Sequence, residues 1–247
     1  MENNKIMMRA MATAGLVVLT SYAFGQSPAA FEVASIKPNV SGDGHSSTHT
    51  SKGGATMRNV SLKQCIEMAY DVKDYALSGP DWLGSERFDI VAKPPSGTPE
   101  DQFKPMMQAL LADRFKMTVY RESKTLSAYA LVVGKNGPQL QKTEVGDGSH
   151  MNHDGHNGKS KLTGQRVSMP RLADFLARQL DRPVIDMTEL TGVFDLKLEW
   201  ADERQPTPDG PSIYTALQEQ LGLKLEARKL PVEILVIDHV ERVPTEN

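Results

Sequence analysis

Hydrophobic positions along the chain follow helical and alternating spacings that recur in the same order in both halves. Met106–Glu122 and Ile213–Lys229 each begin with apolar residues three and four apart and pass into an alternating run, which predicts a helix followed by a strand. Alternating runs at Arg87–Lys93 and Val193–Glu199 predict half-buried strands. Phe31–Lys37 predicts one further strand.

The matched segments keep an almost constant distance along the chain. Val60 and Val167, each followed by a serine and a helical run, lie 107 residues apart, and so do Ala109 and Ala216. We therefore predict an α+β fold with mainly antiparallel sheets, made by tandem duplication of a two-layer α/β sandwich unit. Each unit has the order strand-helix-strand-helix-strand-strand. Chance similarity between two ordinary α/β halves is the alternative.

Turn-forming residues give the expected boundaries. Hairpins at Ser123–Thr125 and at Leu230–Pro231 would make the last two strands of each unit antiparallel neighbours. The predicted domains are 26–140 for the first repeat, 141–160 for a linker loop rich in histidine and glycine, and 161–247 for the second repeat.

The first 25 residues have the pattern of an export signal. Lys5 and Arg9 precede an apolar run from Met11 to Phe24, and small residues at Ala23 and Gly25 suit a signal peptidase, which predicts cleavage before Gln26. We therefore predict a signal peptide over 1–25 and a protein of the periplasm or the cell exterior. An uncleaved anchor helix is the alternative, although the apolar run is shorter than the roughly 20 residues that a span needs. No later segment is apolar over that length.

Composition narrows the possible partners. The 247 residues include 39% hydrophobic and 24% charged residues, as folded globular proteins do. A formal charge of −3 provides no positive field, so we expect no nucleic-acid partner. One cysteine excludes an internal disulfide framework.

Five of the six histidines fall in two polar segments that both begin Gly-Asp-Gly and that we expect to be loops, Gly42–Gly54 and Gly146–Ser160. Imidazoles three or four residues apart could bind zinc, copper or nickel, with Asp147 and Asp154 as further ligands. Solvated loop histidines without a metal are the alternative, because no regular element fixes their spacing. The candidate metal ligands are His45, His49, His150, His153 and His156.

Known catalytic motifs are absent from the sequence, which contains no GxSxG, HExxH, GxxxxGK[ST] or GxGxxG pattern. Cys65 could act as a nucleophile but falls on an apolar helical stripe, which favours a core position. Asp89 and Asp195 could be an acid and base pair, yet their repeat in both halves favours positions that face solvent or cap a turn. Trp82 and Trp200 could stack on a ligand, or each could close its half's core.

Several stretches resemble an uncharacterised, soil-associated family of predicted exported proteins that is expanded in Acidobacteria. The resemblance covers nearly all of the chain after the signal, and similar regions occur behind membrane metallopeptidase sensor domains. It implies no established activity and no catalytic residue. The matching stretches are FEVASIKP (31–38), SGPDWLGSERFDIVAK (78–93), MMQALLADRFKMTVYRE (106–122), YALVVGKNGPQL (129–140), LTGVFDLKLEW (190–200) and GPSIYTALQEQLGLKLEARKLPVEILVIDHVERVPTEN (210–247).

The sequence favours a non-enzymatic binding or interaction module for a peptide, a protein or a component of the cell envelope. Unpaired strand edges give such a module one physical route to an extended partner. A metal-binding protein of the periplasm or exterior is the second hypothesis. An exported hydrolase is the third, and it would need catalytic residues from separate segments.

Overall fold

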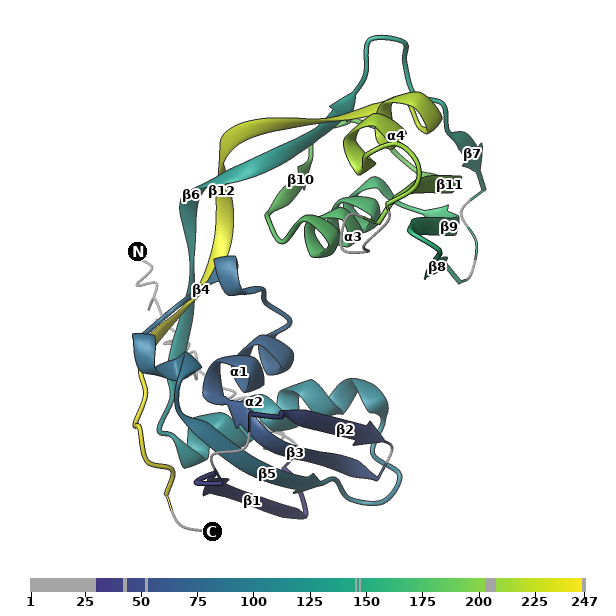
Figure 1. Cartoon of the computed structure of the whole chain (residues 1–247). Helices are drawn as coiled ribbons and strands as arrows, with labels where there is room; N and C mark the ends of the chain where they lie inside the picture. Colours follow the sequence, from purple (N-terminus) through teal and green to yellow (C-terminus); the bar gives the residue numbers. More distant parts are fainter. Residues whose placement is uncertain are drawn as a thin grey trace, which may run out of the picture.

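The computed structural model describes residues 30–41, 44–51, 53–144, 146, 148–202 and 208–245, and it shows two α+β lobes at the two ends of a long strand pair (Figure 1). The α+β class with mostly antiparallel sheets is confirmed. The predicted signal peptide lies outside the described residues. None of the helices in the described ranges is both long and apolar enough to cross a membrane.

The first lobe is a four-stranded antiparallel sheet with two helices packed on it. The strand order is β1-β5-β3-β2, which leaves β1 and β2 as the outer strands. Its apolar core lies between the sheet and the helices. The elements are β1 (Val33–Pro38), β2 (Ser47–Ser51), β3 (Gly54–Ser61), α1 (Leu62–Tyr70), β5 (Arg87–Lys93) and α2 (Phe103–Arg114), with short 3₁₀ turns at Asp74–Ala76, Asp81–Gly84 and Glu100–Gln102.

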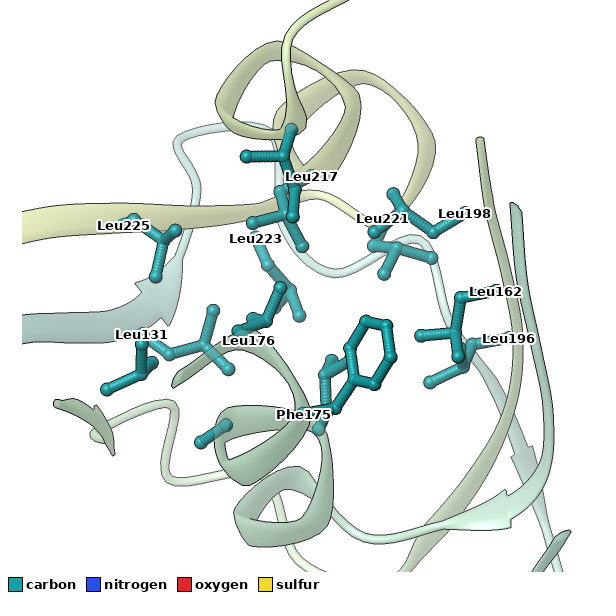
Figure 2. Close-up of a cluster of buried hydrophobic side chains, with 14 of the residues drawn as sticks. Leu131, Leu162, Phe175, Leu176, Leu196, Leu198, Leu217, Leu221, Leu223 and Leu225 are labelled. Carbon is teal, nitrogen blue, oxygen red and sulfur yellow. The ribbon is translucent and has the colours of Figure 1, made fainter. Parts of the chain in front are cut away.

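The second lobe has the same construction. Its sheet order β7-β11-β9-β8 places each strand where the first lobe has β1, β5, β3 and β2. In Figure 2, Phe175 points from α3 toward Leu162 and Leu196 of the sheet, and Leu217 and Leu221 close the core from the α4 side. The elements are β7 (Gln141–Thr143), β8 (His150–His156), β9 (Lys159–Val167), α3 (Met169–Leu180), β11 (Val193–Ala201) and α4 (Ile213–Gln220).

A third sheet joins the lobes and interlocks the two halves. The long strands β6 (Thr118–Val133) and β12 (Leu223–His239) pair antiparallel along nearly their whole length. The short strand β4 (Leu77–Ser78) runs parallel to β12, and β10 (Val184–Asp186) runs parallel to β6. Each half therefore pairs its short strand with the long strand of the other half.

The two predicted hairpins are wrong. The chain runs straight through Ser123–Thr125 in β6 and through Leu230–Pro231 in β12, and Thr125 pairs with Pro231 across the ribbon. The middle of each strand is largely exposed and is therefore rich in polar residues. In the sequence, a polar stretch of this kind cannot be distinguished from a turn. Pro231 is tolerated because β12 has a partner on one side alone at that point.

The expectation that both histidine-rich segments are loops is also wrong. The segment 141–160 contains β7 and β8, and the first histidine segment contains β2. Both β2 and β8 are outer strands, and their residues are almost all exposed. An outer strand that buries so little has no apolar alternation, so hydrophobic periodicity could not reveal it.

Local capping sets the position of the helices. The Ser61 hydroxyl accepts a hydrogen bond from the Gln64 amide while the Gln64 side chain accepts one from the Ser61 amide, which forms a capping box at the start of α1. Asp71 ends α1 in the left-handed conformation, and Asp181 ends α3 in the same way. Matched ends thus give α1 and α3 equivalent places in the two lobes.

Candidate binding cleft between the lobes

A cleft of about 660 Å³ opens between the two lobes, beside the middle of the ribbon. Equivalent segments of the two halves form its walls. On one side lie α1 and the turn that follows it, and on the other lie α3 and β10. Arg121 and Glu233, one from each long strand, form a 2.6 Å ion pair at its base.

Acidic groups stand at matching places in the two helical walls. Glu67 of α1 and Asp174 of α3 both line the cleft, and they lie 107 residues apart, the same offset that relates the two helices. Asp71 adds a third carboxylate, while Lys73 and Arg178 carry positive charge. The cleft therefore presents both signs of charge at close range.

Partial burial shifts the pKa values of Glu67 and Tyr75, both of which line the cleft. The pKa of Glu67 is raised mainly by burial, and Lys63 opposes this effect while Asp74 reinforces it. The pKa of Tyr75 is raised by burial and then by the carboxylates of Asp181 and Asp174, which belong to the other half. The two walls are thus electrostatically coupled across the cleft.

Apolar surface and an open strand edge complete the site. Met68, Ala177 and Val232 line the cleft together with Pro183, Val184 and Ile185 of the β10 region. β10 is the outer strand of its sheet, and outer strands carry unpaired backbone donors and acceptors. An extended chain could therefore pair with backbone there while its side chains contact both apolar and charged groups.

The structure places the five candidate metal-binding histidines on or just before two strands in separate lobes. His49 lies on β2, with His45 just before it, and His150, His153 and His156 lie on β8. His153 stacks on Trp200, with ring centroids 5.4 Å apart. Among the residues described, no three His, Cys, Asp or Glu side chains form a group able to hold a metal ion. Asp147 lies outside the described residues, and the shared metal site stays a prediction.

The other candidate residues have structural positions. Cys65 is buried in the first core, and burial raises the pKa of its thiol to about 12, which keeps it protonated and unreactive. Asp89 and Asp195 each accept a hydrogen bond from a backbone amide in a strand bulge. Trp200 is buried in the second core and Trp82 packs against the first, which confirms that each closes the core of its half.

Sequence reasoning missed the cleft, although one signal was available. Glu67 and Asp174 are acidic residues at the same place in two matched helices, and this coincidence could have been read from the 107-residue offset. The contribution of β10 could not have been found in the same way, because its three residues pair with a strand of the other half.

Comparison with known proteins identifies the family. A family model described as a protein of unknown function (DUF3738) matches residues 63–240, which is most of the chain. No curated protein and no solved structure matches significantly. The match covers the ribbon, the second lobe and the part of the first lobe that follows β3, and the chain belongs to the DUF3738 family.

Proposed function

We propose that the protein is an exported binding module that holds an extended segment of a partner protein or peptide in the cleft between its lobes. The main support for this proposal is that α1 and the turn after it, from one half, and α3 and β10, from the other half, line one cleft of about 660 Å³. The signal-like pattern over residues 1–25 supports export.

The lining of the cleft indicates the chemistry of the partner. The carboxylates of Glu67 and Asp174 suit a lysine or arginine side chain. Glu67 is half-buried, and desolvation strengthens its attraction for an opposite charge, whereas Asp174 is exposed. The apolar surface around Met68 and Val184 suits an aliphatic neighbour. A peptide that alternates basic and apolar residues fits both features in an extended conformation.

Selection from a random peptide library tests this proposal. The protein from Gln26 onward is immobilised, and the recovered peptides are measured by isothermal titration calorimetry against the parent and against a Glu67→Gln, Asp174→Asn double variant. We expect basic peptides that bind the double variant at least tenfold more weakly. Glu219→Gln, on the exposed side of α4, is the matched control and keeps parental affinity.

Two results would count against the proposal. Recovered peptides with equal affinity for the parent and the double variant would show that the cleft is not the binding site. Recovery of no peptide, together with binding of isolated envelope polysaccharide to the same cleft, would move the function to an envelope component.

We also propose that the halves, residues 26–140 and 161–247 with the connecting segment 141–160, descend from one duplicated unit. The matching element order and the crossed pairing of β4 and β10 support this origin.

A further inference from the structure

The outer strand of the second lobe is held against its helix by a cluster of aromatic rings. His153 of β8 stacks on Trp200 of β11, with an interplanar angle of 8°. The Phe175 ring of α3 packs edge-on against both, with centroid distances of 5.4 Å to His153 and 6.2 Å to Trp200.

Strand register identifies the same place in the first lobe. His153 pairs with Leu162 of β9, and Thr50 pairs with Ala55 of β3. Ala55 and Leu162 are 107 residues apart, so Thr50 occupies the place of His153.

The other two rings have counterparts as well. Met68 lies 107 residues before Phe175 on the matching helix. Ala92 pairs with Ala55 as Leu198 pairs with Leu162, and two residues further on Pro94 takes the place of Trp200. Each ring of the second lobe is thus replaced by a residue without an aromatic ring.

A cavity of about 420 Å³ opens in the first lobe at this place. Thr50, Met68 and Pro94 all line it, and Phe103 of α2 lies beside them. A smaller cavity of about 290 Å³ lies next to it along β2, lined by Thr48, Met57, Cys65 and Met68. Thr48 pairs with Met57 as Met151 pairs with Gly164, so this second space lies where Met151 packs on the second core.

We propose that the larger cavity binds an aromatic side chain of a protein partner whose extended segment pairs with the outer edge of β2. The second lobe shows that this place in the fold accommodates stacked rings. β2 is the outermost strand of its sheet, so its edge can receive another strand.

The spacing of the two cavities predicts a recognition pattern. Side chains two residues apart lie on the same face of a strand. A segment that places an aromatic ring beside Thr50 therefore places the residue two positions away beside Thr48, above the smaller cavity. The expected motif is an aromatic residue and an aliphatic residue separated by one residue. Met68 also lines the cleft between the lobes, whereas Thr50 and Pro94 line this cavity and not the cleft.

A pair of synthetic peptides tests the inference. The probe is the acetylated and amidated heptapeptide Lys-Thr-Trp-Thr-Leu-Thr-Lys, and its partner has alanine in place of tryptophan. Binding to the protein from Gln26 onward is measured by isothermal titration calorimetry. We expect the tryptophan peptide to bind at least tenfold more tightly than the alanine peptide. Equal affinity, or no binding of either peptide, would overturn the proposal.

Variants that fill the cavity locate the site. A Thr50→His, Met68→Phe, Pro94→Trp triple variant reproduces the side chains of the second lobe and should lose the tenfold preference. Thr50→His alone is the milder version, leaves the lining of the cleft unchanged and should reduce the preference, with thermal melting as the test of folding for both. His49→Phe adds bulk to β2 one residue from Thr50, where the strand's alternation turns the side chain to the opposite face, and should keep the preference. Retention of the preference by both folded cavity variants would overturn the assignment.

One further arm separates a protein partner from a free aromatic compound. N-acetyl-tryptophanamide has the ring but cannot form a strand beside β2, so we expect it to bind at least tenfold more weakly than the peptide. Equal affinity of the two would overturn pairing with the strand edge.

Discussion

The carboxylate of Asp195 accepts a hydrogen bond from the backbone amide of Arg166 at 2.9 Å, and Asp89 accepts the same bond from Asn59 at 2.9 Å. Arg166 and Asn59 both have φ of +52°, a left-handed conformation that costs a non-glycine residue about 1 kcal/mol or more. Both lie where the strand register shifts, and each aspartate stands opposite its bulge. The carboxylates thus stabilise the same irregularity in both lobes.

Removal of either carboxylate should destabilise the protein. We expect Asp89→Ala and Asp195→Ala each to lower the free energy of unfolding by about 1–3 kcal/mol, because the bulge amide loses its charged acceptor. Urea denaturation followed by circular dichroism measures the change. The exposed Glu219→Ala is the control, and a loss no larger than the control's would show that the bulge does not need the carboxylate.

Acid should weaken the first lobe through Asp89. The Asn39 side-chain amide and the Asn59 backbone amide donate to its carboxylate and lower its pKa. A carboxyl group whose pKa is lower in the folded state stabilises the fold fully above its unfolded pKa of about 3.9, and this contribution is lost as the pH falls through the folded pKa.

The test compares the parent with Asp89→Asn in urea denaturation between pH 5 and pH 2.5. We expect the parent to lose more stability than the variant over this range. Parallel curves for the two proteins would contradict the role of Asp89.

Gly222 should tolerate no side chain. It begins the return from α4 into β12 with φ of +65°, and a Cβ atom there would lie 2.1 Å from the carbonyl oxygen of Gly137. We expect Gly222→Ala to cost about 2–4 kcal/mol, since backbone strain and a clash with backbone add together. Gly137→Ala, at φ of +78° with open space around its Cβ, should cost only about 1 kcal/mol. Equal melting temperatures for the two variants would refute this difference.

His153 should contribute to stability through its ring rather than through a metal. We expect His153→Ala to lower the free energy of unfolding by about 0.5–1.5 kcal/mol, because its stacking on Trp200 is lost. His150→Ala, on the exposed start of β8, should change stability little.

Zinc retained after dialysis of the untagged protein, measured beside these unfolding experiments, distinguishes the two roles. A shared metal site would make both variants lose zinc to a similar extent. That result, with equal stability of the two variants, would favour the metal hypothesis over the packing role.

Much of the fold could be predicted from the sequence because residues that face a core are apolar and recur at helical or alternating spacing. The stripe through Leu62, Cys65, Ile66 and Ala69 predicts α1, and all four side chains are buried. The additional strand expected at Phe31–Lys37 corresponds to β1. These elements bury one face against a single core, so local periodicity is sufficient to find them.

Features that depend on distant pairing could not be predicted. The middle of β6 has no buried face, so Ser123–Thr125 read as a turn, although each residue has a partner in β12. The cleft likewise depends on how α1 and α3 come together around the ribbon, which the pattern of neither helix encodes. In the sequence, the only sign of the roles of Glu67 and Asp174 is that both are acidic and lie at matching positions of the two halves.

The crossed pairing of the short strands affects the order in which the chain can fold. β6 is complete about 90 residues before β12 begins, yet β12 is its main partner and also the partner of β4. During synthesis, the sixteen residues of β6 therefore stay unpaired on at least one side until β12 has been made. Such an edge is a template for intermolecular pairing, so a nascent chain that stalls before Leu223 is expected to aggregate or to recruit a chaperone.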